Sequence, residues 1–147
     1  MGAGDPTDDF WDLIRKIRFN KHRQVELTDC GCGLGITLKG AEERGIPLRG
    51  VDLAKRRGQH KAVEQLDATM LSWGPTRWPL ICRPDGSGWC HDVITKARQQ
   101  GASAIYIGVA RNYERDLSRF RTRRLKGVFG EEDERAWIIR PLKKDRV

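Results

Sequence analysis

At residues 25–35 the chain reads VELTDCGCGLG, a short apolar and β-branched run that ends in alternating glycines. The run predicts a buried strand, and residues 36–44 carry a helical pattern that stops at Gly45. Glycines at 31, 33 and 35 let the backbone turn tightly and approach a ligand without a Cβ in the way. The following helix offers free N–H groups and the positive end of its dipole. This stretch predicts a strand–loop–helix unit with a nucleotide-like ligand at its glycine loop.

Strand and helix patterns alternate on both sides of this unit. Further strands are expected at about 48–53, 68–73, 79–83, 104–109 and 135–140, and further helices at about 10–19, 54–66, 89–100 and 114–125. Strands separated by helices form parallel crossovers. The pattern predicts one α/β domain with a doubly wound, mostly parallel sheet and helices on both faces. We expect this domain to span residues 11–142, between a flexible N-terminus (1–10) and a basic tail (143–147).

The composition limits the classes of protein to which the chain can belong. Its 147 residues suffice for one domain, and no apolar run approaches the length needed to cross a bilayer. The acidic N-terminal residues carry no secretory signal pattern, so a cytoplasmic protein with reduced thiols is expected. With 28 basic and 20 acidic residues the formal charge is +8, which favours polyanionic partners, nucleic acid first among them.

Two kinds of nucleotide ligand compete for the glycine loop. The dinucleotide fingerprint G-x-G-x-x-G requires a glycine where Ile36 stands, and this disfavours a dinucleotide-dependent reductase. The observed pattern at residues 29–35, D-x-G-x-G-x-G, instead resembles the first motif of the Rossmann-like (class I) S-adenosylmethionine-dependent methyltransferases. The likeness extends over roughly residues 25–110 through the order of the strands. It implies S-adenosylmethionine as the cofactor of a minimal or degenerate member.

The resemblance also implies which residues contact that cofactor. An acid at the end of the second strand grips the ribose, which corresponds to Asp52, and the next residue, Leu53, packs on the adenine. Asp52 follows the glycine loop by about 20 residues, a spacing that brings it beside the loop in a doubly wound sheet. An acid after the following crossover, Asp67, would contact the adenine amino group. The full set of expected cofactor residues is Asp29, Cys30, Gly31, Cys32, Gly33, Gly35, Asp52, Leu53, Asp67, Ala68 and Cys82.

The segment after the fourth strand carries the expected catalytic groups. Residues 81–89 read ICRPDGSGW, which matches neither the Asp/Asn-Pro-Pro-aromatic motif nor the Pro-Cys nucleophile of base methyltransferases. Asp85 could accept a proton, Trp89 could stack on a target and Arg83 could contact an anion. The same residues also suit an ordinary Pro-Asp-Gly turn with a buried Trp.

The C-terminal end raises a second doubt about catalysis. Only one strong strand is visible there, so we expect the sheet to lack the terminal hairpin of the family and to be C-terminally shortened. Two functions remain open: a methyltransferase that acts on nucleic acid or another substrate, and a non-catalytic binding protein of the same fold. A homodimer or a partner subunit would fit either function.

The sequence also contains four cysteines and a cluster of arginines that could bind a ligand. The spacings of Cys30, Cys32, Cys82 and Cys90 do not follow zinc-site patterns, so no metal is expected. A dense basic cluster follows the fifth strand, and at helical spacing its members would share one face and could contact phosphates. The expected nucleic-acid contacts are Arg111, Arg115, Arg119, Arg123 and Arg124.

Overall fold

A computed structural model describes residues 6–130 and 133–143. Its elements are α1 (Asp8–Arg18), β1 (Glu26–Cys30), α2 (Ile36–Glu43), β2 (Arg49–Asp52), β3 (Glu64–Gln65), the 3-10 turn Ala68–Met70, β4 (Arg77–Cys82), α3 (Trp89–Gln99), β5 (Ala104–Gly108), the 3-10 turn Ala110–Asn112, α4 (Tyr113–Leu117), β6 (Arg123–Gly130) and β7 (Glu134–Ile139). Of the expected flexible segment, residues 1–5 lie outside the described residues, and α1 begins at Asp8. Residues 144–147 of the expected tail also lie outside them.

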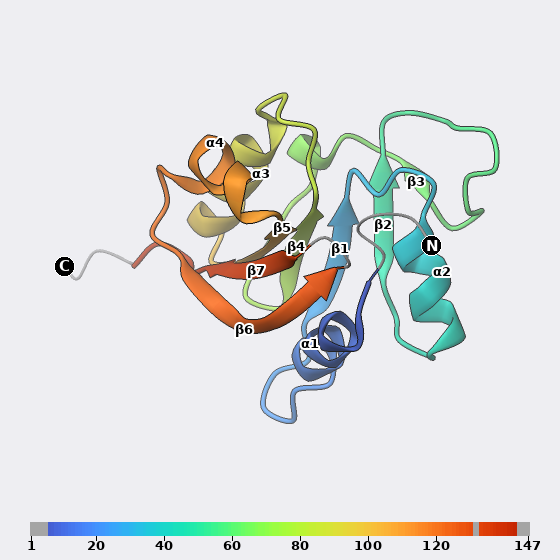
Figure 1. The fold of residues 1–147 in the computed structure, drawn as a ribbon, viewed down its shortest axis with the longest axis horizontal. Coiled ribbons are helices and arrows are strands. Elements are labelled where there is room, and N and C mark those ends of the chain that lie inside the picture. The colour runs from blue at the N-terminus through green and yellow to red at the C-terminus, as the bar shows by residue number, and fades with distance from the viewer. Residues whose placement is uncertain (1–5, 131–132, 144–147) are drawn as a thin grey trace.

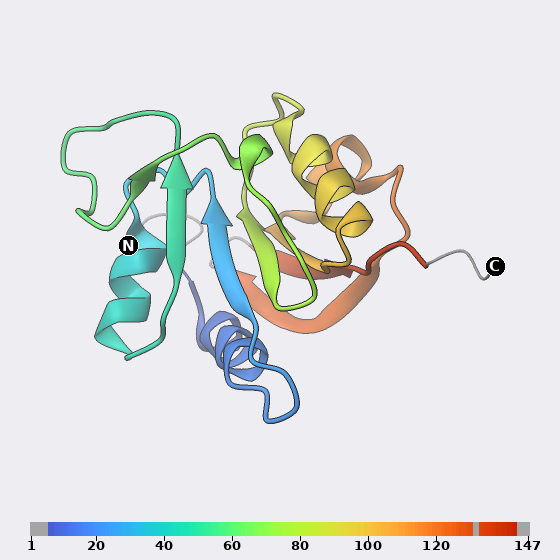
Figure 2. The same cartoon turned by 180° about the vertical axis from the view of Figure 1, so that it is seen from behind.

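The strands form one seven-stranded sheet in the order β3-β2-β1-β4-β5-β7-β6. β1 to β5 are parallel to one another, and β7 runs antiparallel to both β5 and β6. The chain leaves β1 in one direction through α2 and returns past β1 to β4, so α2 and α3 cover opposite faces (Figures 1 and 2). The expected doubly wound α/β architecture is confirmed.

The core lies between the sheet and its helices because the central strands are apolar on both faces. All five residues of β5 are buried. α3 presents Val93, Ile94 and Ala97 to β4 and β5, and none of these side chains is exposed. On the other face α1 buries Phe10 and Trp11, and the Trp11 ring takes the space that a Cβ at Gly40 would occupy. Thr7 caps this helix by accepting a hydrogen bond from the Phe10 N–H.

The expected helix at 54–66 is wrong. Residues 53–63 form an irregular crossover, named here the β2–β3 loop, and the chain then adds only the two-residue strand β3 (Figure 1). The segment is rich in basic residues and has no continuous apolar face to pack on the sheet, so helix formation would bury little surface. Gly58, with φ +79°, breaks the backbone further. The expected strand at 68–73 is also wrong, since Ala68–Met70 is a 3-10 turn.

The C-terminal expectation also needs correction. Instead of one helix over 114–125, the helix α4 ends at Leu117, and Arg123–Gly130 forms the edge strand β6. β6 and β7 form a terminal antiparallel hairpin, so the expectation of a C-terminally shortened sheet is wrong. From Arg124 to Val128 exposed and partly buried positions alternate along β6, and its charged residues are exposed at the sheet edge. This period of two in exposure is the pattern of a half-buried edge strand, so Arg123 and Arg124 lie on a strand and not on a helix face.

Candidate functional site

A pocket of about 480 Å³ opens at the carboxyl ends of the parallel strands. Segments that follow β1, β2, β3 and β4 meet there because parallel strands end at the same edge of a sheet. The structure brings together nine of the residues that the sequence pointed to: Gly31, Gly33, Asp52, Leu53, Asp67, Ala68, Arg83, Asp85 and Trp89. The pocket therefore joins the expected cofactor residues to the expected catalytic ones.

The glycine loop has backbone angles that residues with a side chain rarely adopt. Gly31, Gly33 and Gly35 all have positive φ, at +68°, +59° and +83°. A Cβ at Gly31 would lie 3.0 Å from the Trp89 ring, whereas a Cβ at Gly33 would meet nothing within 4 Å. Glycine at 31 thus lets the indole approach the loop, and glycine at 33 leaves the loop open toward the pocket.

Asp52 fastens this loop to the end of β2. Its Oδ2 accepts a hydrogen bond of 2.8 Å from the Gly33 N–H, and its Oδ1 accepts one of 2.8 Å from the Ala54 N–H. Each carboxylate oxygen keeps a free lone pair, because it can accept two hydrogen bonds. The side chain is partly exposed and lines the pocket, so it can still accept bonds from a ligand hydroxyl.

Asp67 lines the far side of the pocket with Ala68. Its Oδ1 accepts hydrogen bonds from the Thr69 hydroxyl at 2.7 Å and the Thr69 N–H at 2.9 Å, and these bonds lower the pKa of the carboxyl. Neither bond uses Oδ2, which leaves an anionic acceptor for a ligand. Beside it, the apolar Leu53 side chain is 72% exposed and also lines the pocket.

The opposite wall is built from the segment after β4. Arg83 has φ +50°, and its guanidinium donates a 2.7 Å hydrogen bond to Glu134, whose carboxylate is 2% exposed. Asp85 accepts hydrogen bonds from the Ser87 hydroxyl and the Ser87 N–H, and these lower its pKa. Arg83 is thus held by a buried partner, and Asp85 stays ionised and is a weak base at neutral pH.

Five expected cofactor residues lie outside the pocket lining: Asp29, Cys30, Cys32, Gly35 and Cys82. Asp29 is buried behind the loop, where it accepts a hydrogen bond from the Thr37 hydroxyl, and burial raises its pKa to about 6. Burial raises the pKa of the Cys30 and Cys82 thiols well above their usual value, which keeps both neutral. Gly35 is the N-cap of α2, and a Cβ at this position would lie 2.8 Å from the His60 side chain. Asp29 is therefore bonded to α2 through Thr37 and does not line the pocket.

The expected arginine cluster does not share one helical face. Arg111 lies in a 3-10 turn, Arg115 on α4, Arg119 in the turn after it, and Arg123 and Arg124 on β6. Arg115 is already engaged, since it pairs with Asp116 at 2.7 Å and donates to the Pro84 carbonyl. A Cβ at Gly86 would lie 2.8 Å from the same guanidinium, so Arg115 packs beneath the loop at 84–88.

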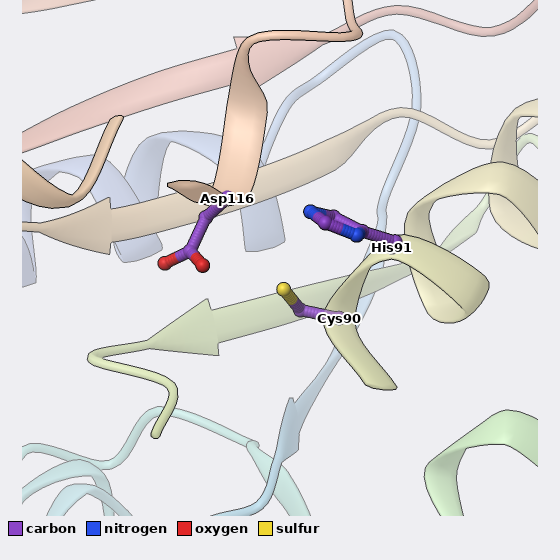
Figure 3. A group of neighbouring side chains, drawn as sticks. All are labelled: Cys90, His91 and Asp116. Carbon is purple, nitrogen blue, oxygen red and sulfur yellow. The ribbon is translucent and has the colours of Figure 1, made fainter. Parts of the chain in front are cut away.

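Cys90, His91 and Asp116 bring three potential metal-ligand atoms within 4.8 Å of one another (Figure 3). Their other contacts compete with a cation. Asp116 accepts hydrogen bonds from Tyr106 and from the Arg115 guanidinium, which already supplies a positive charge. Burial raises the pKa of the Cys90 thiol to about 11, and His91 contacts the Arg115 carbonyl at 3.1 Å. The group is best described as a hydrogen-bonded link between α3 and α4.

Comparison with solved structures extends this description. No protein-family model matches the sequence, and no curated protein matches it. Magnesium protoporphyrin IX methyltransferase (ChlM) of Synechocystis PCC 6803, solved with bound S-adenosylmethionine, aligns with 91% of this chain and 78% of its own at 12% identity and a TM-score of 0.55. Monomeric WbdD aligns with 92% of this chain at 11% identity and a TM-score of 0.64. A second structure of WbdD, a bifunctional kinase-methyltransferase, aligns at 10% identity and a TM-score of 0.59.

The chain has the fold of the class I S-adenosylmethionine-dependent methyltransferases. At identities this low the likeness establishes the fold alone, and the chain spans only 42% of the WbdD chain. Among the described residues, no helix of this methyltransferase fold is long and apolar enough to cross a membrane.

The pocket of the methyltransferase fold includes residues that sequence reasoning missed. They are Ala54, Arg56, Leu66, Pro84 and Ser87. Each lies within a few positions of Leu53, Asp67 or Asp85, and this closeness in sequence is the one feature that could have predicted them. The helix expected at 54–66 gives no reason to place Arg56 in the pocket, and only the irregular path of the β2–β3 loop brings it there.

Proposed function

We propose that the chain binds S-adenosylmethionine in the pocket at the carboxyl ends of β1, β2 and β4 and transfers its methyl group. The observation that carries this proposal is the meeting of four separate motifs around one cavity of about 480 Å³. A glycine-rich turn without a ligand would not need Asp52 at the end of the next strand or Asp67 after the crossover. The lining also offers what the cofactor needs: an open loop, two carboxylates and exposed apolar side chains.

The proposed contacts follow from the chemistry of each group. Gly33 leaves room for the cofactor to approach the loop backbone, and Asp52 accepts hydrogen bonds from the ribose hydroxyls. Leu53 and Ala68 pack against the adenine, and Asp67 accepts a hydrogen bond from its amino group. Each partner lies where the segment after a parallel strand reaches the pocket.

When bound, S-adenosylmethionine supplies a methyl group already activated on a sulfonium. The chain then has to hold an acceptor in line with that methyl group and exclude competing water. Trp89 presents an aromatic ring at the pocket wall, and Arg83 presents a cation held in place by Glu134. Because Asp85 is a weak base, the acceptor must be nucleophilic without strong help in losing a proton.

A non-catalytic binding protein of the same fold is the second candidate. Among the described residues that line the pocket there is no His, Cys, Lys or Tyr, so the lining offers no general base that titrates near neutral pH. Such a protein would bind S-adenosylmethionine in the pocket without transferring its methyl group.

Calorimetric titration with S-adenosylmethionine tests binding, and Asp52→Ala is the decisive variant. We expect the parent to bind and the variant to lose about 1.5–3 kcal/mol of binding free energy, because one charged acceptor is removed. Glu43→Gln, an exposed carboxylate on α2, is the control and should bind like the parent. No binding by the parent, or equal binding by Asp52→Ala, would contradict the proposal.

A methyl-transfer assay separates the two candidates. The positive charge of the chain makes nucleic acid the first acceptor class to test, followed by small molecules and basic protein. Transfer to any of them supports the enzyme. Binding of S-adenosylmethionine without transfer to any of them supports the binding protein.

A further inference from the structure

A second cavity lies at the other end of the sheet from the candidate cofactor pocket. It has a volume of about 360 Å³ and is called here the basic groove. Its lining includes Val25, just before β1, and Trp78, near the start of β4, whereas the cofactor pocket is lined by residues that follow these strands. β4 spans six residues, or about 20 Å, so the two cavities are separate sites.

The rim of the basic groove is positive on two opposing sides. α1 and the segment after it contribute Lys16 and Arg23, and the C-terminal hairpin contributes Arg123 and the adjoining Arg140. All four side chains are exposed. No Asp or Glu lines the groove, and none of the ion pairs between described residues uses Lys16, Arg23, Arg123 or Arg140.

On the α1 side of the groove, two acidic side chains near Lys16 and Arg23 in sequence pair with other residues. Asp12 of α1 pairs with Arg15 at 3.7 Å, and Glu26 at the start of β1 pairs with Arg77 at 3.4 Å. The positive charge of the rim is therefore not neutralised by these neighbours. This charge predicts an anionic occupant that reaches both sides of the groove at once.

The floor of the groove is apolar. Leu13 and Ile17 of α1 face Leu125 of β6 across it, and all three side chains are only partly buried. A ligand that carried negative charge alone would leave this floor in contact with water. The occupant must therefore present flat or apolar groups between its charges.

An exposed aromatic residue follows α1. Phe19 is the C-cap of this helix and directly precedes the groove residue Asn20 in the chain, and it is 52% exposed. The Arg18 guanidinium lies 5.8 Å from the centre of its ring. An exposed aromatic ring with an arginine beside it is a platform on which a nucleic acid base can stack.

From this combination we infer that the basic groove binds single-stranded nucleic acid. The cations contact the phosphates from both sides, and the bases lie on the apolar floor and on Phe19. Arginine predominates on the rim, and its planar guanidinium suits phosphate oxygens. A duplex would keep its bases stacked inside and would gain little from the apolar floor. The inference does not require that the nucleic acid be the methyl acceptor.

Fluorescence anisotropy with a labelled oligouridylate RNA of about 12 nucleotides tests the inference. The parent should bind at low salt, and Lys16→Gln/Arg123→Gln should bind at least about tenfold more weakly. The slope of log affinity against log salt should become shallower by about 1.4, because two phosphate contacts are lost. Phe19→Ala should weaken binding about fivefold or more without changing that slope.

Lys39→Gln/Arg57→Gln is the matched control, because it removes the same charge from exposed positions that do not line the groove. Thermal unfolding and S-adenosylmethionine titration check that every variant is folded. No RNA binding by the parent, or equal weakening by both double variants, would overturn the inference. Tighter binding of a duplex of the same length, of polyglutamate or of anionic lipid vesicles would overturn the assignment of the occupant.

Discussion

Asp29 is a carboxyl group that the fold holds at the end of β1 with 3% of its surface exposed. Burial raises its pKa to about 6, although the Thr37 hydroxyl and the Arg83 charge both work in the opposite direction. In the unfolded chain the same group titrates near 3.8. The folded state therefore binds this proton more tightly, and the stability linked to it is lost as the pH rises through about 6.

Asp29→Asn should be more stable than the parent at about pH 7.5, by up to about 3 kcal/mol, because asparagine cannot ionise. The difference should shrink toward zero near pH 4, where Asp29 is protonated in the folded chain. Urea unfolding at the two pH values measures it. Glu43→Gln, on the exposed surface of α2, should change neither value by a comparable amount. A parent as stable as Asp29→Asn at the higher pH would contradict the burial argument.

At the scale of elements, the β2–β3 loop replaces a helix and is held by a few polar contacts. The Gln59 amide donates hydrogen bonds to the Gly33 carbonyl at 2.9 Å and the Ala54 carbonyl at 3.0 Å, and the His60 N–H donates to the Leu34 carbonyl. The β2–β3 loop and the glycine loop therefore hold each other in place through these hydrogen bonds, and both line the pocket.

Gln59→Ala should loosen this contact and weaken S-adenosylmethionine binding about three- to tenfold, the effect of losing one or two hydrogen bonds. Hydrogen exchange should become faster in residues 53–63 and in the glycine loop. Lys61→Ala, at an exposed position in the same loop, is the control. Unchanged exchange and affinity in Gln59→Ala would show that the loop is ordered by other means.

At the scale of the whole molecule, the candidate pocket joins segments that are far apart in the chain. Residues 31–33, 52–56, 66–68 and 83–89 meet only when the parallel strands are assembled, so a ligand there binds only the folded state. Binding and global stability are consequently coupled.

S-adenosylmethionine at about 100 times its dissociation constant should stabilise the fold by about 2.7 kcal/mol. For a domain of this size the midpoint of thermal unfolding should then rise by about 5–10 °C. Scanning fluorimetry measures the shift, and Asp52→Ala at the same ligand concentration should show a smaller one. A comparable shift with NAD would indicate a dinucleotide site instead.

The sequence by itself determined the class of fold and most of the pocket wall. Local signals were sufficient there: Gly31 and Gly33 follow a buried strand, Asp52 follows the next one, and parallel strands bring such positions to one edge. The central strand β5 and the helix α3 were equally clear, because their apolar patterns extend over whole elements.

Tertiary structure alone decided the features that depend on long-range pairing. β6 becomes a strand because β7 offers it a hydrogen-bonding edge, although its arginines read locally as a helix face. The β2–β3 loop stays irregular because its basic residues have no apolar surface to bury, and this irregularity brings Arg56 to the pocket. The basic groove is formed by α1 and a hairpin more than a hundred residues later in the chain, so no local pattern could indicate it.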